Sequence, residues 1–152
     1  MNVDTRSDLA GELFGVVGRF RRQLRRSTGG GFDRTGLTQS QAELLRLVAR
    51  RPGISVREAA TELGLAANTA STLVSRLAAE DLLTRSVDST DRRVGRLRLT
   101  DAAQEVADRS RRARRTALAG ALEALEDTQI DDLTKGLAVI AELTRLLQED
   151  QQ

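Results

Sequence analysis

The sequence predicts a mainly α-helical protein with one small β-hairpin. Apolar residues recur at helical spacing in six segments. Two short stretches between residues 82 and 100 alternate apolar and polar side chains, as half-buried strands do. Turn-forming residues separate these segments, and 152 residues suffice for one domain with a modest core.

The first predicted helix runs from Ser7 to Arg26, and a glycine-rich link follows it. Its apolar stripe consists of Leu9, Leu13, Val16, Val17, Phe20 and Leu24. The stretch STGGGFDRTG ends the helix, because a run of glycines does not sustain helical structure.

The second predicted helix lies in LTQSQAELLRLVARR. Thr38 suits its N-cap, and Pro52 ends it because proline disfavours helical backbone at the residue before it. Its apolar stripe consists of Leu44, Leu45 and Val48.

Two helices joined by a tight turn come next. Ser55 caps VREAATEL, with Glu58 at the capping-box position, and Gly64 ends this helix. The following helix, AANTASTLVSRLAAEDL, is expected to bury Leu73, Val74 and Leu77.

The stretches LLTRSV and GRLRLT flank DSTDRR, a run of turn-forming residues, and together they predict a β-hairpin. Strand alternation points Leu97 and Leu99 inward and Arg96 and Arg98 outward.

A long alanine-rich helix is predicted from Asp101 to about Leu125, and a final helix follows a short break at EDTQ. The final helix carries a heptad seam with one polar position: Ile130, Leu133, Leu137, Ile140, Thr144 and Leu147. This seam and the stripe of the first helix have no evident partner in so small a chain. They could be monomer core, but a symmetric homodimer is the favoured interpretation.

The composition argues against an enzyme. The chain has no His, Cys, Trp or Tyr, and only three Phe. It therefore lacks the usual groups for acid–base and nucleophilic catalysis, for zinc binding and for thiol redox sensing. We expect no cofactor and no metal. A carboxylate-based enzyme would need converging acids, and the acids here are spread or gathered near the C-terminal end.

The net charge of +2 hides an uneven distribution. Arginines concentrate without acids in 19–26 and in 109–115, and they outnumber acids in 85–98. The first two clusters could extend a nucleic-acid footprint, but solvated faces or pairs with the acidic C-terminal helix are the favoured interpretation.

No apolar run approaches the length of a membrane span, and the N-terminal residues lack a signal-peptide pattern. We expect a cytoplasmic protein.

The two short helices and their glycine turn suit a helix-turn-helix, in which the second helix enters the major groove. Small polar side chains and one arginine on that helix are the candidate contacts to bases and phosphates: Asn68, Thr69, Ser71, Thr72, Ser75 and Arg76. An ordinary helical hairpin with a solvated polar face is the alternative.

The hairpin favours DNA binding further. Arg92 and Arg93 lie at its turn, where arginine can reach the negative potential of a minor groove. The alternative is a charged surface turn in which one of them only pairs with Asp91.

From Gln41 to Thr100 the chain resembles the winged-helix domain of the MarR family (multiple antibiotic resistance regulators). The matching stretches are LTQSQAELL, RPGISVREAATELGLAANTASTLVSRL and DSTDRRVGRLRLT. The last carries the family's wing pattern in Asp91, Arg93, Leu97, Leu99 and Thr100. Two positions depart from the pattern, because Asp81 and Ala103 stand where glycine is usual.

The resemblance implies a winged helix-turn-helix with flanking dimerisation helices. Residues 1–36 would be the N-terminal dimerisation helix and link, 37–100 the DNA-binding domain, and 101–152 the C-terminal dimerisation helices. It implies a homodimer on a pseudo-palindromic operator, most simply a repressor, released by a small aromatic or phenolic effector. No effector-binding residue is assigned. The alternative function is a winged-helix protein-interaction module of the anti-activator type.

Overall fold

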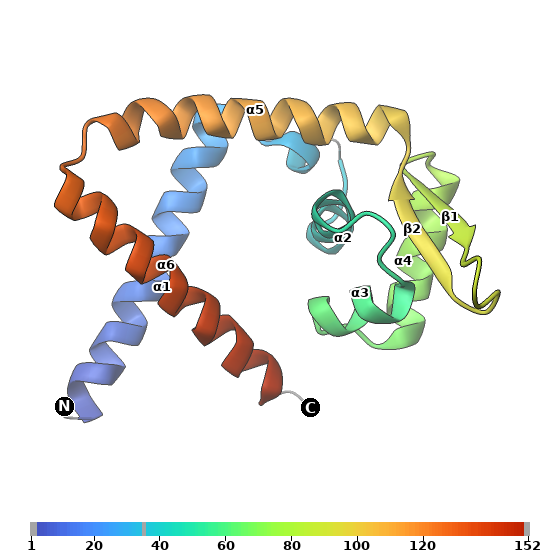
Figure 1. Ribbon diagram of the computed structural model, residues 1–152, viewed down its shortest axis with the longest axis horizontal. Coiled ribbons are helices and arrows are strands. Elements are labelled where there is room, and N and C mark those ends of the chain that lie inside the picture. The colour runs from blue at the N-terminus through green and yellow to red at the C-terminus, as the bar shows by residue number, and fades with distance from the viewer. Residues whose placement is uncertain (1–2, 35, 151–152) are drawn as a thin grey trace.

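The computed structural model describes residues 3–34 and 36–150, so residues 1–2 and 151–152 of the predicted outer segments and residue 35 of the link lie outside the described residues. In chain order the elements are α1 (Val3–Thr28), the 3-10 helix η1 (Gly31–Arg34), α2 (Gln39–Arg50), α3 (Val56–Leu63), α4 (Ala67–Ala79), β1 (Leu83–Val87), β2 (Gly95–Leu99), α5 (Asp101–Glu123) and α6 (Asp127–Glu149) (Figure 1). The predicted order of helices and hairpin is confirmed.

Predicted N-caps form as expected. Thr38 Oγ1 accepts the Gln41 backbone N–H at 3.3 Å, and the Gln41 side chain accepts the Thr38 N–H at 2.9 Å. Ser55 and Glu58 form the same reciprocal pair, with distances of 3.1 and 2.9 Å. These bonds satisfy backbone donors that have no partner inside the helix.

The turn between α3 and α4 depends on Gly64, whose φ of 64° is left-handed. Beyond this turn, α4 buries Ala70, Val74 and Leu77. The sequence analysis was wrong about Leu73, which is only partly buried while Ala70 occupies the inner face. A residue as small as alanine there allows α3 and α4 to lie close together.

The hairpin pairs Leu83 with Leu99 and Arg85 with Leu97 in antiparallel register. A short third segment joins its edge: the Leu97 N–H donates to Ile54 O at 2.9 Å, and the Gly53 N–H donates to Leu97 O at 2.8 Å. This pairing ties the wing to the turn between α2 and α3.

One core fills the lobe that contains α2, α3, α4 and the hairpin, and the first half of α5 closes it. Leu45, Leu77 and Leu97 are fully buried at its centre. Phe32 of η1 also belongs to this core, so the glycine-rich link anchors α1 to the lobe. Gly31 permits the close approach of η1 to α5, because a Cβ there would lie 2.6 Å from Ser110 Oγ.

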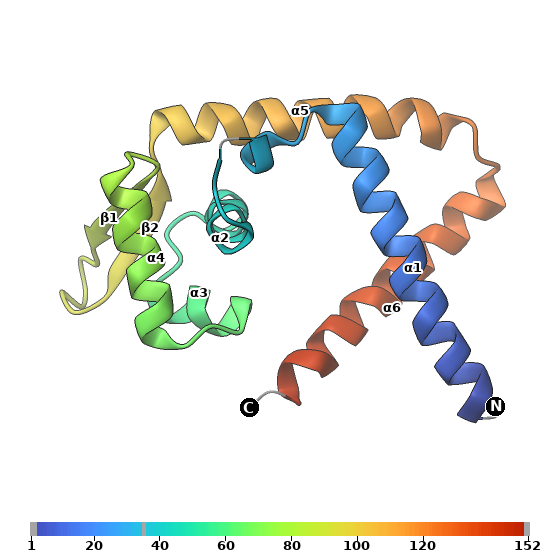
Figure 2. The same cartoon turned by 180° about the vertical axis from the view of Figure 1, so that it is seen from behind.

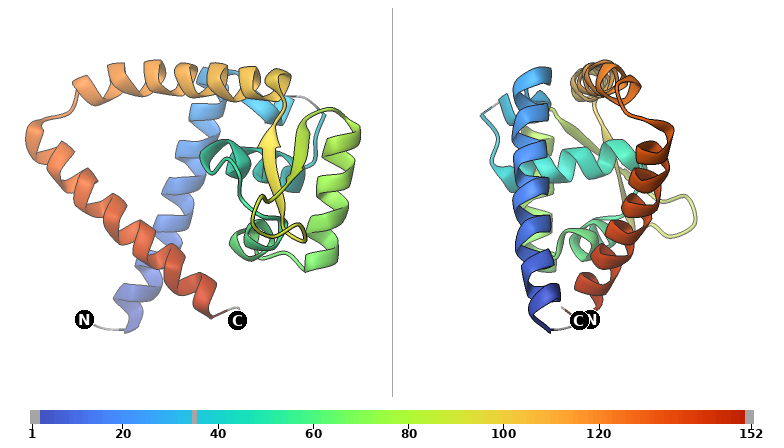
Figure 3. Two further views of the ribbon diagram at one scale, coloured as in Figure 1. Left: turned by 45° about the vertical axis from the view of Figure 1, so that its right-hand side comes forward. Right: turned by 90° about the vertical axis from the view of Figure 1, so that its left-hand side faces the viewer.

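Helix α5 extends out of the lobe as a long arm, and α6 turns back from its far end (Figures 1 and 2). Helix α1 packs on α5. Helices α1 and α6 cross in Figure 1, but the end-on view in Figure 3 separates them.

Helix α6 packs extensively against no other described element and buries none of its residues. Its exposed apolar residues are Leu133, Leu137, Val139, Ile140, Leu143, Leu146 and Leu147. On α1, Phe14 is 86% exposed, and Leu9, Val16, Val17 and Phe20 are exposed as well. Both stripes that the sequence analysis singled out therefore lack a partner within the described part of the chain.

Among residues 3–34 and 36–150, no helix combines the length and the apolar character that crossing a membrane requires.

Candidate nucleic-acid interface

All six polar candidates on α4 are exposed: Asn68, Thr69, Ser71, Thr72, Ser75 and Arg76. At about 100° per residue they span an arc of roughly 160°, opposite the buried Ala70, Val74 and Leu77. The core therefore fixes which face of α4 points outward, and the structure brings these residues together on that face.

Two candidates also make local hydrogen bonds. Asn68 Oδ1 accepts the Thr69 N–H at 2.8 Å, and the Thr72 hydroxyl donates to Asn68 O at 2.9 Å. The Asn68 amide nitrogen and the Thr72 oxygen lone pairs remain available, so these side chains can still bind base edges.

The sequence analysis missed a feature at the start of α4. The N-cap residue is Ala66, which makes no side-chain cap hydrogen bond. Helices α2, α3 and α5 are capped by Thr38, Ser55 and Thr100. The first turn of α4 therefore keeps backbone N–H groups and a positive dipole end that suit an anion such as a DNA phosphate.

Two aspartates shape the wing loop. Asp88 Oδ1 accepts the Thr90 N–H at 3.1 Å, and Asp91 Oδ1 accepts the Arg93 N–H at 3.0 Å. Such Asx turns hold the backbone in a tight loop. The loop projects from the lobe on the side of α4 (Figure 1).

Arg92 and Arg93 are both exposed at the tip of this loop. The Arg93 Nε lies 3.3 Å from Asp91 Oδ1, as the alternative interpretation of the turn expected. The Arg93 side chain is 92% exposed, however, so this ion pair is weak and can be exchanged for a phosphate. Arg92 forms no ion pair with any described residue.

The expected outward position of Arg96 is wrong in part. Its guanidinium folds back over the base of the wing, where Nη2 lies 2.9 Å from Asp88 Oδ2 and Nη1 lies 3.7 Å from Glu58 Oε2. Nη1 also donates to Gly53 O at 3.3 Å. Arg96 thereby connects the wing to the start of α3, whereas Arg98 is exposed as expected.

The charges of this cluster reinforce one another. The hydrogen bond from the Thr90 N–H, followed by the Arg96 side chain, lowers the pKa of Asp88. Hydrogen bonds from Ser55 lower the pKa of Glu58, with smaller contributions from Arg51 and Arg96. Both carboxylates are therefore ionised at neutral pH and hold the arginine in place.

The predicted pairing of α5 arginines with acidic α6 does not occur within the described residues. On α6, Glu142 and Glu149 pair with Arg145 of the same helix. No group of three carboxylates suited to a metal ion exists within ranges 3–34 and 36–150.

Comparison with known proteins places this geometry. A sequence model of the MarR family matches residues 35–94. This segment belongs to the MarR family. It contains the helix-turn-helix and most of the wing loop, so the family assignment rests on the same residues as the geometry.

Solved structures extend the MarR fold to nearly the whole chain. A MarR family protein from Bacillus stearothermophilus is 22% identical, with a TM-score of 0.74 over 95% of this chain and 99% of that one. Streptococcus pneumoniae FabT, solved in complex with DNA, is 17% identical, with a TM-score of 0.71 over 96% and 99%. RV1404 from Mycobacterium tuberculosis is 22% identical, with a TM-score of 0.69 over 90% and 92%. A comparison with curated protein sequences gives no match.

Proposed function

We propose that this protein is a dimeric DNA-binding transcriptional regulator. The observation that carries the proposal is the position of two cationic and polar surfaces on one rigid lobe. The polar face of α4 and the arginine-tipped wing belong to elements that share one core through Val74, Leu83 and Leu97.

In this proposal α4 enters the major groove, and Asn68, Thr69, Ser71, Thr72, Ser75 and Arg76 contact bases and phosphates. The wing reaches the adjacent minor groove or its phosphates through Arg92 and Arg93. The solved complex of FabT with DNA supports this function for a chain of the same fold.

The active species is a homodimer on a pseudo-palindromic site. The exposed apolar stripes of α1 and α6 are the surfaces that a second copy would cover. Binding would occlude a promoter, so repression is the simplest outcome. An effector bound between the flanking helices and the winged lobe would shift the dimer toward a state with weaker DNA affinity.

The test measures binding of the wild-type protein and of Arg93→Ala to labelled duplex from its own upstream region, with random duplex as reference. We expect wild-type affinity to fall steeply with salt, because phosphate contacts release counterions. Loss of Arg93 should weaken binding by about 1–3 kcal/mol, roughly 5- to 150-fold, and relax preference at flanking A·T positions.

Arg109→Ala is the matched control, since it removes the same charge from an exposed position on α5. It should change affinity far less than Arg93→Ala. Equal, small effects of the two variants would show that the wing does not contact DNA. An absence of any preference over random duplex would favour the protein-interaction module instead.

A further inference from the structure

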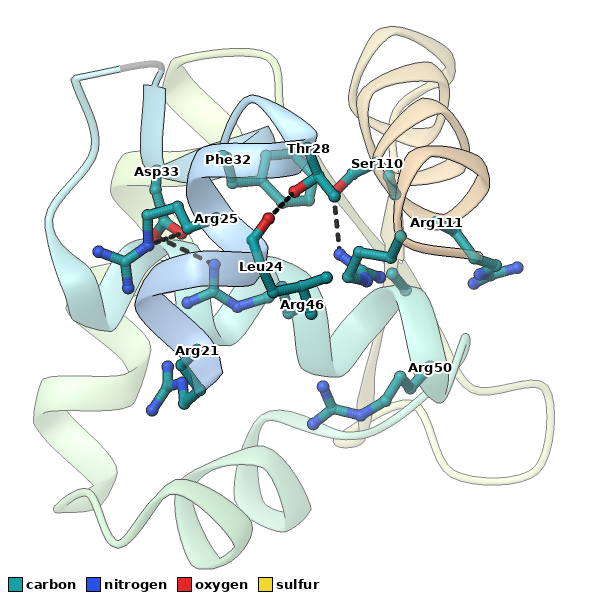
Figure 4. A pocket seen from close by; sticks show the side chains of 14 residues that line it. Arg21, Leu24, Arg25, Thr28, Phe32, Asp33, Arg46, Arg50, Ser110 and Arg111 are labelled. Atoms are coloured by element: carbon teal, nitrogen blue, oxygen red, sulfur yellow. Dashed lines mark hydrogen bonds and ion pairs between the residues drawn. The ribbon is translucent and has the colours of Figure 1, made fainter. Parts of the chain in front are cut away.

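A pocket of about 340 Å³ lies where α1, η1 and α5 meet α2 (Figure 4). Its volume is in the range of small-molecule sites. Six arginines line it, from three different helices: Arg21, Arg25, Arg46, Arg50, Arg111 and Arg114. Asp33 is the one carboxylate among the lining residues.

Asp33 neutralises only one side of the pocket. Its Oδ1 lies 3.2 Å from Arg46 Nη1, and its Oδ2 lies 3.6 Å from Arg25 Nε. Figure 4 shows this carboxylate between the two arginines, with Ser110 and Arg111 of α5 on the opposite side.

The remaining cations have no counter-charge among the described residues. Arg114 donates to the neutral Ser110 hydroxyl at 2.8 Å. Arg21, Arg50 and Arg111 form no ion pair with any residue of ranges 3–34 and 36–150. Converging cations repel one another, and this repulsion is relieved when an anion binds among them.

Helix dipoles account for only part of this cluster. Arg25 and Arg50 lie in the last turns of α1 and α2, where cations are favourable. Arg111 and Arg114 lie in the middle of α5. A solvated charged face does not explain the cluster either, because the Arg46 side chain is only 26% exposed and Arg114 is half-buried.

We infer that this pocket binds a small organic anion with at least two negative charges, and that this anion is the effector. The inference rests on the proposed function for its regulatory part. Guanidinium groups suit carboxylate and phosphate oxygens, which they can bind in pairs. Leu24, Ala49 and Ala107 give the pocket an apolar wall for the body of the ligand.

The charge of this ligand differs from the expectation for a phenol. The lining contains a single aromatic residue, Phe32, which is buried in the core of the lobe. Stacking on aromatic rings therefore contributes little, and charge provides the affinity and the selectivity.

The position of the pocket links the ligand to DNA binding. Arg46 and Arg50 move with the lobe, whereas Arg21 and Arg114 belong to the flanking helices. An anion held between them fixes the angle of the lobe relative to α1 and α5. In a dimer that angle sets the spacing of the two recognition helices, and this spacing must match the operator.

The first experiment follows thermal unfolding and calorimetric binding with benzoate, phthalate and phenyl phosphate, with ionic strength held constant. Phthalate and benzoate share a ring and differ by one carboxylate. We expect saturable stabilisation by phthalate and phenyl phosphate, and binding of benzoate that is at least tenfold weaker.

Arg21→Gln/Arg114→Gln should weaken phthalate and phenyl phosphate binding roughly tenfold or more. Arg22→Gln/Arg115→Gln is the matched control, because it removes the same charge from the same two helices at positions outside the lining. Equal losses in both variants, or equal binding of benzoate and phthalate, would overturn the proposed site.

A second arm adds duplex DNA. Saturating phthalate should change the DNA affinity of the wild type several-fold and leave that of Arg21→Gln/Arg114→Gln unchanged. Anion binding is measured without DNA, so its failure is distinct from failure of the proposed DNA binding. Saturable anion binding that leaves DNA affinity unchanged would retain the site and contradict its role as effector.

Discussion

At the scale of single residues, the two aspartates of the wing do different work from the arginines beside them. Asp88 and Asp91 form the turns of the loop and also pair with Arg96 and Arg93. The pairing of Asp88 with Arg96 secures the base of the wing. The pairing of Asp91 with Arg93 competes with DNA for the same guanidinium.

Asp91→Asn tests this competition. The asparagine Oδ1 can still accept the Arg93 N–H, so the loop keeps its turn, but the carboxylate charge is lost. We expect DNA affinity to rise by about 1.5- to 5-fold, since exposed ion pairs contribute about 0.2–1 kcal/mol. Fluorescence anisotropy at fixed salt measures this change.

Asp91→Ala is the companion variant, because it removes both the charge and the turn acceptor. It should gain less affinity than Asp91→Asn, since the loop loses its turn-forming hydrogen bond. A fall in affinity for Asp91→Asn would show that the ion pair positions Arg93 for DNA instead of competing with it.

At the scale of elements, much of the structure could be predicted because its determinants are local. The caps at Thr38 and Ser55 each need a partner three residues along the chain, and Gly64 needs only its own freedom at positive φ. The face of α4 could be predicted in outline from its periodicity, with Leu73 as the error.

Contacts between distant segments could not be predicted from the sequence. Nothing near Ile54 indicates that it pairs with β2, and nothing in the glycine-rich link indicates that Phe32 enters the core. The arginine pocket has the same origin, because its members come from three clusters that are separate in the sequence.

The turn that joins α4 to β1 contains a strained residue, which leads to a stability prediction. Asp81 has a φ of 60°, the one positive φ of a non-glycine among residues 3–34 and 36–150. The MarR resemblance places glycine at this position. The hydrogen bonds printed by the turn are to the Asp81 backbone: its N–H donates to Ala78 O at 3.1 Å, and its carbonyl accepts the Thr100 hydroxyl at 2.8 Å.

Asp81→Gly should therefore retain these bonds and stabilise the protein by about 0.5 kcal/mol, the relief of left-handed strain less the added freedom of the unfolded chain. Urea unfolding measures the difference. Glu80→Gly is the control, since Glu80 has a φ of −84° and should lose stability on substitution. Destabilisation of both variants to the same extent would show that Asp81 is not strained.

At the scale of the whole molecule, the chain divides into a lobe with a complete core and an open frame of helices. An opening of about 720 Å³ separates Leu147 and Thr144 of α6 from the turn between α3 and α4. The seam of α6 is thus not covered by its own lobe. A second copy of the chain could cover it with its own α1 and α6.

This arrangement predicts that dimerisation and the folding of the lobe can be separated. Leu137 and Ile140 are 56% and 39% exposed, and neither belongs to the core of the lobe. Leu137→Glu/Ile140→Glu should therefore convert a dimer to a monomer in sedimentation experiments while the lobe still unfolds cooperatively. DNA affinity should fall by more than tenfold, because a monomer engages only one half-site.

Lys135→Glu is the matched control: it changes the net charge by the same amount on α6 but lies away from the heptad seam. It should remain dimeric and bind DNA with at most the moderate loss that added negative charge causes. A wild-type protein that sediments as a monomer at micromolar concentration would contradict the dimer. It would also leave the exposed apolar stripes of α1 and α6 to a different partner, in line with the interaction-module alternative.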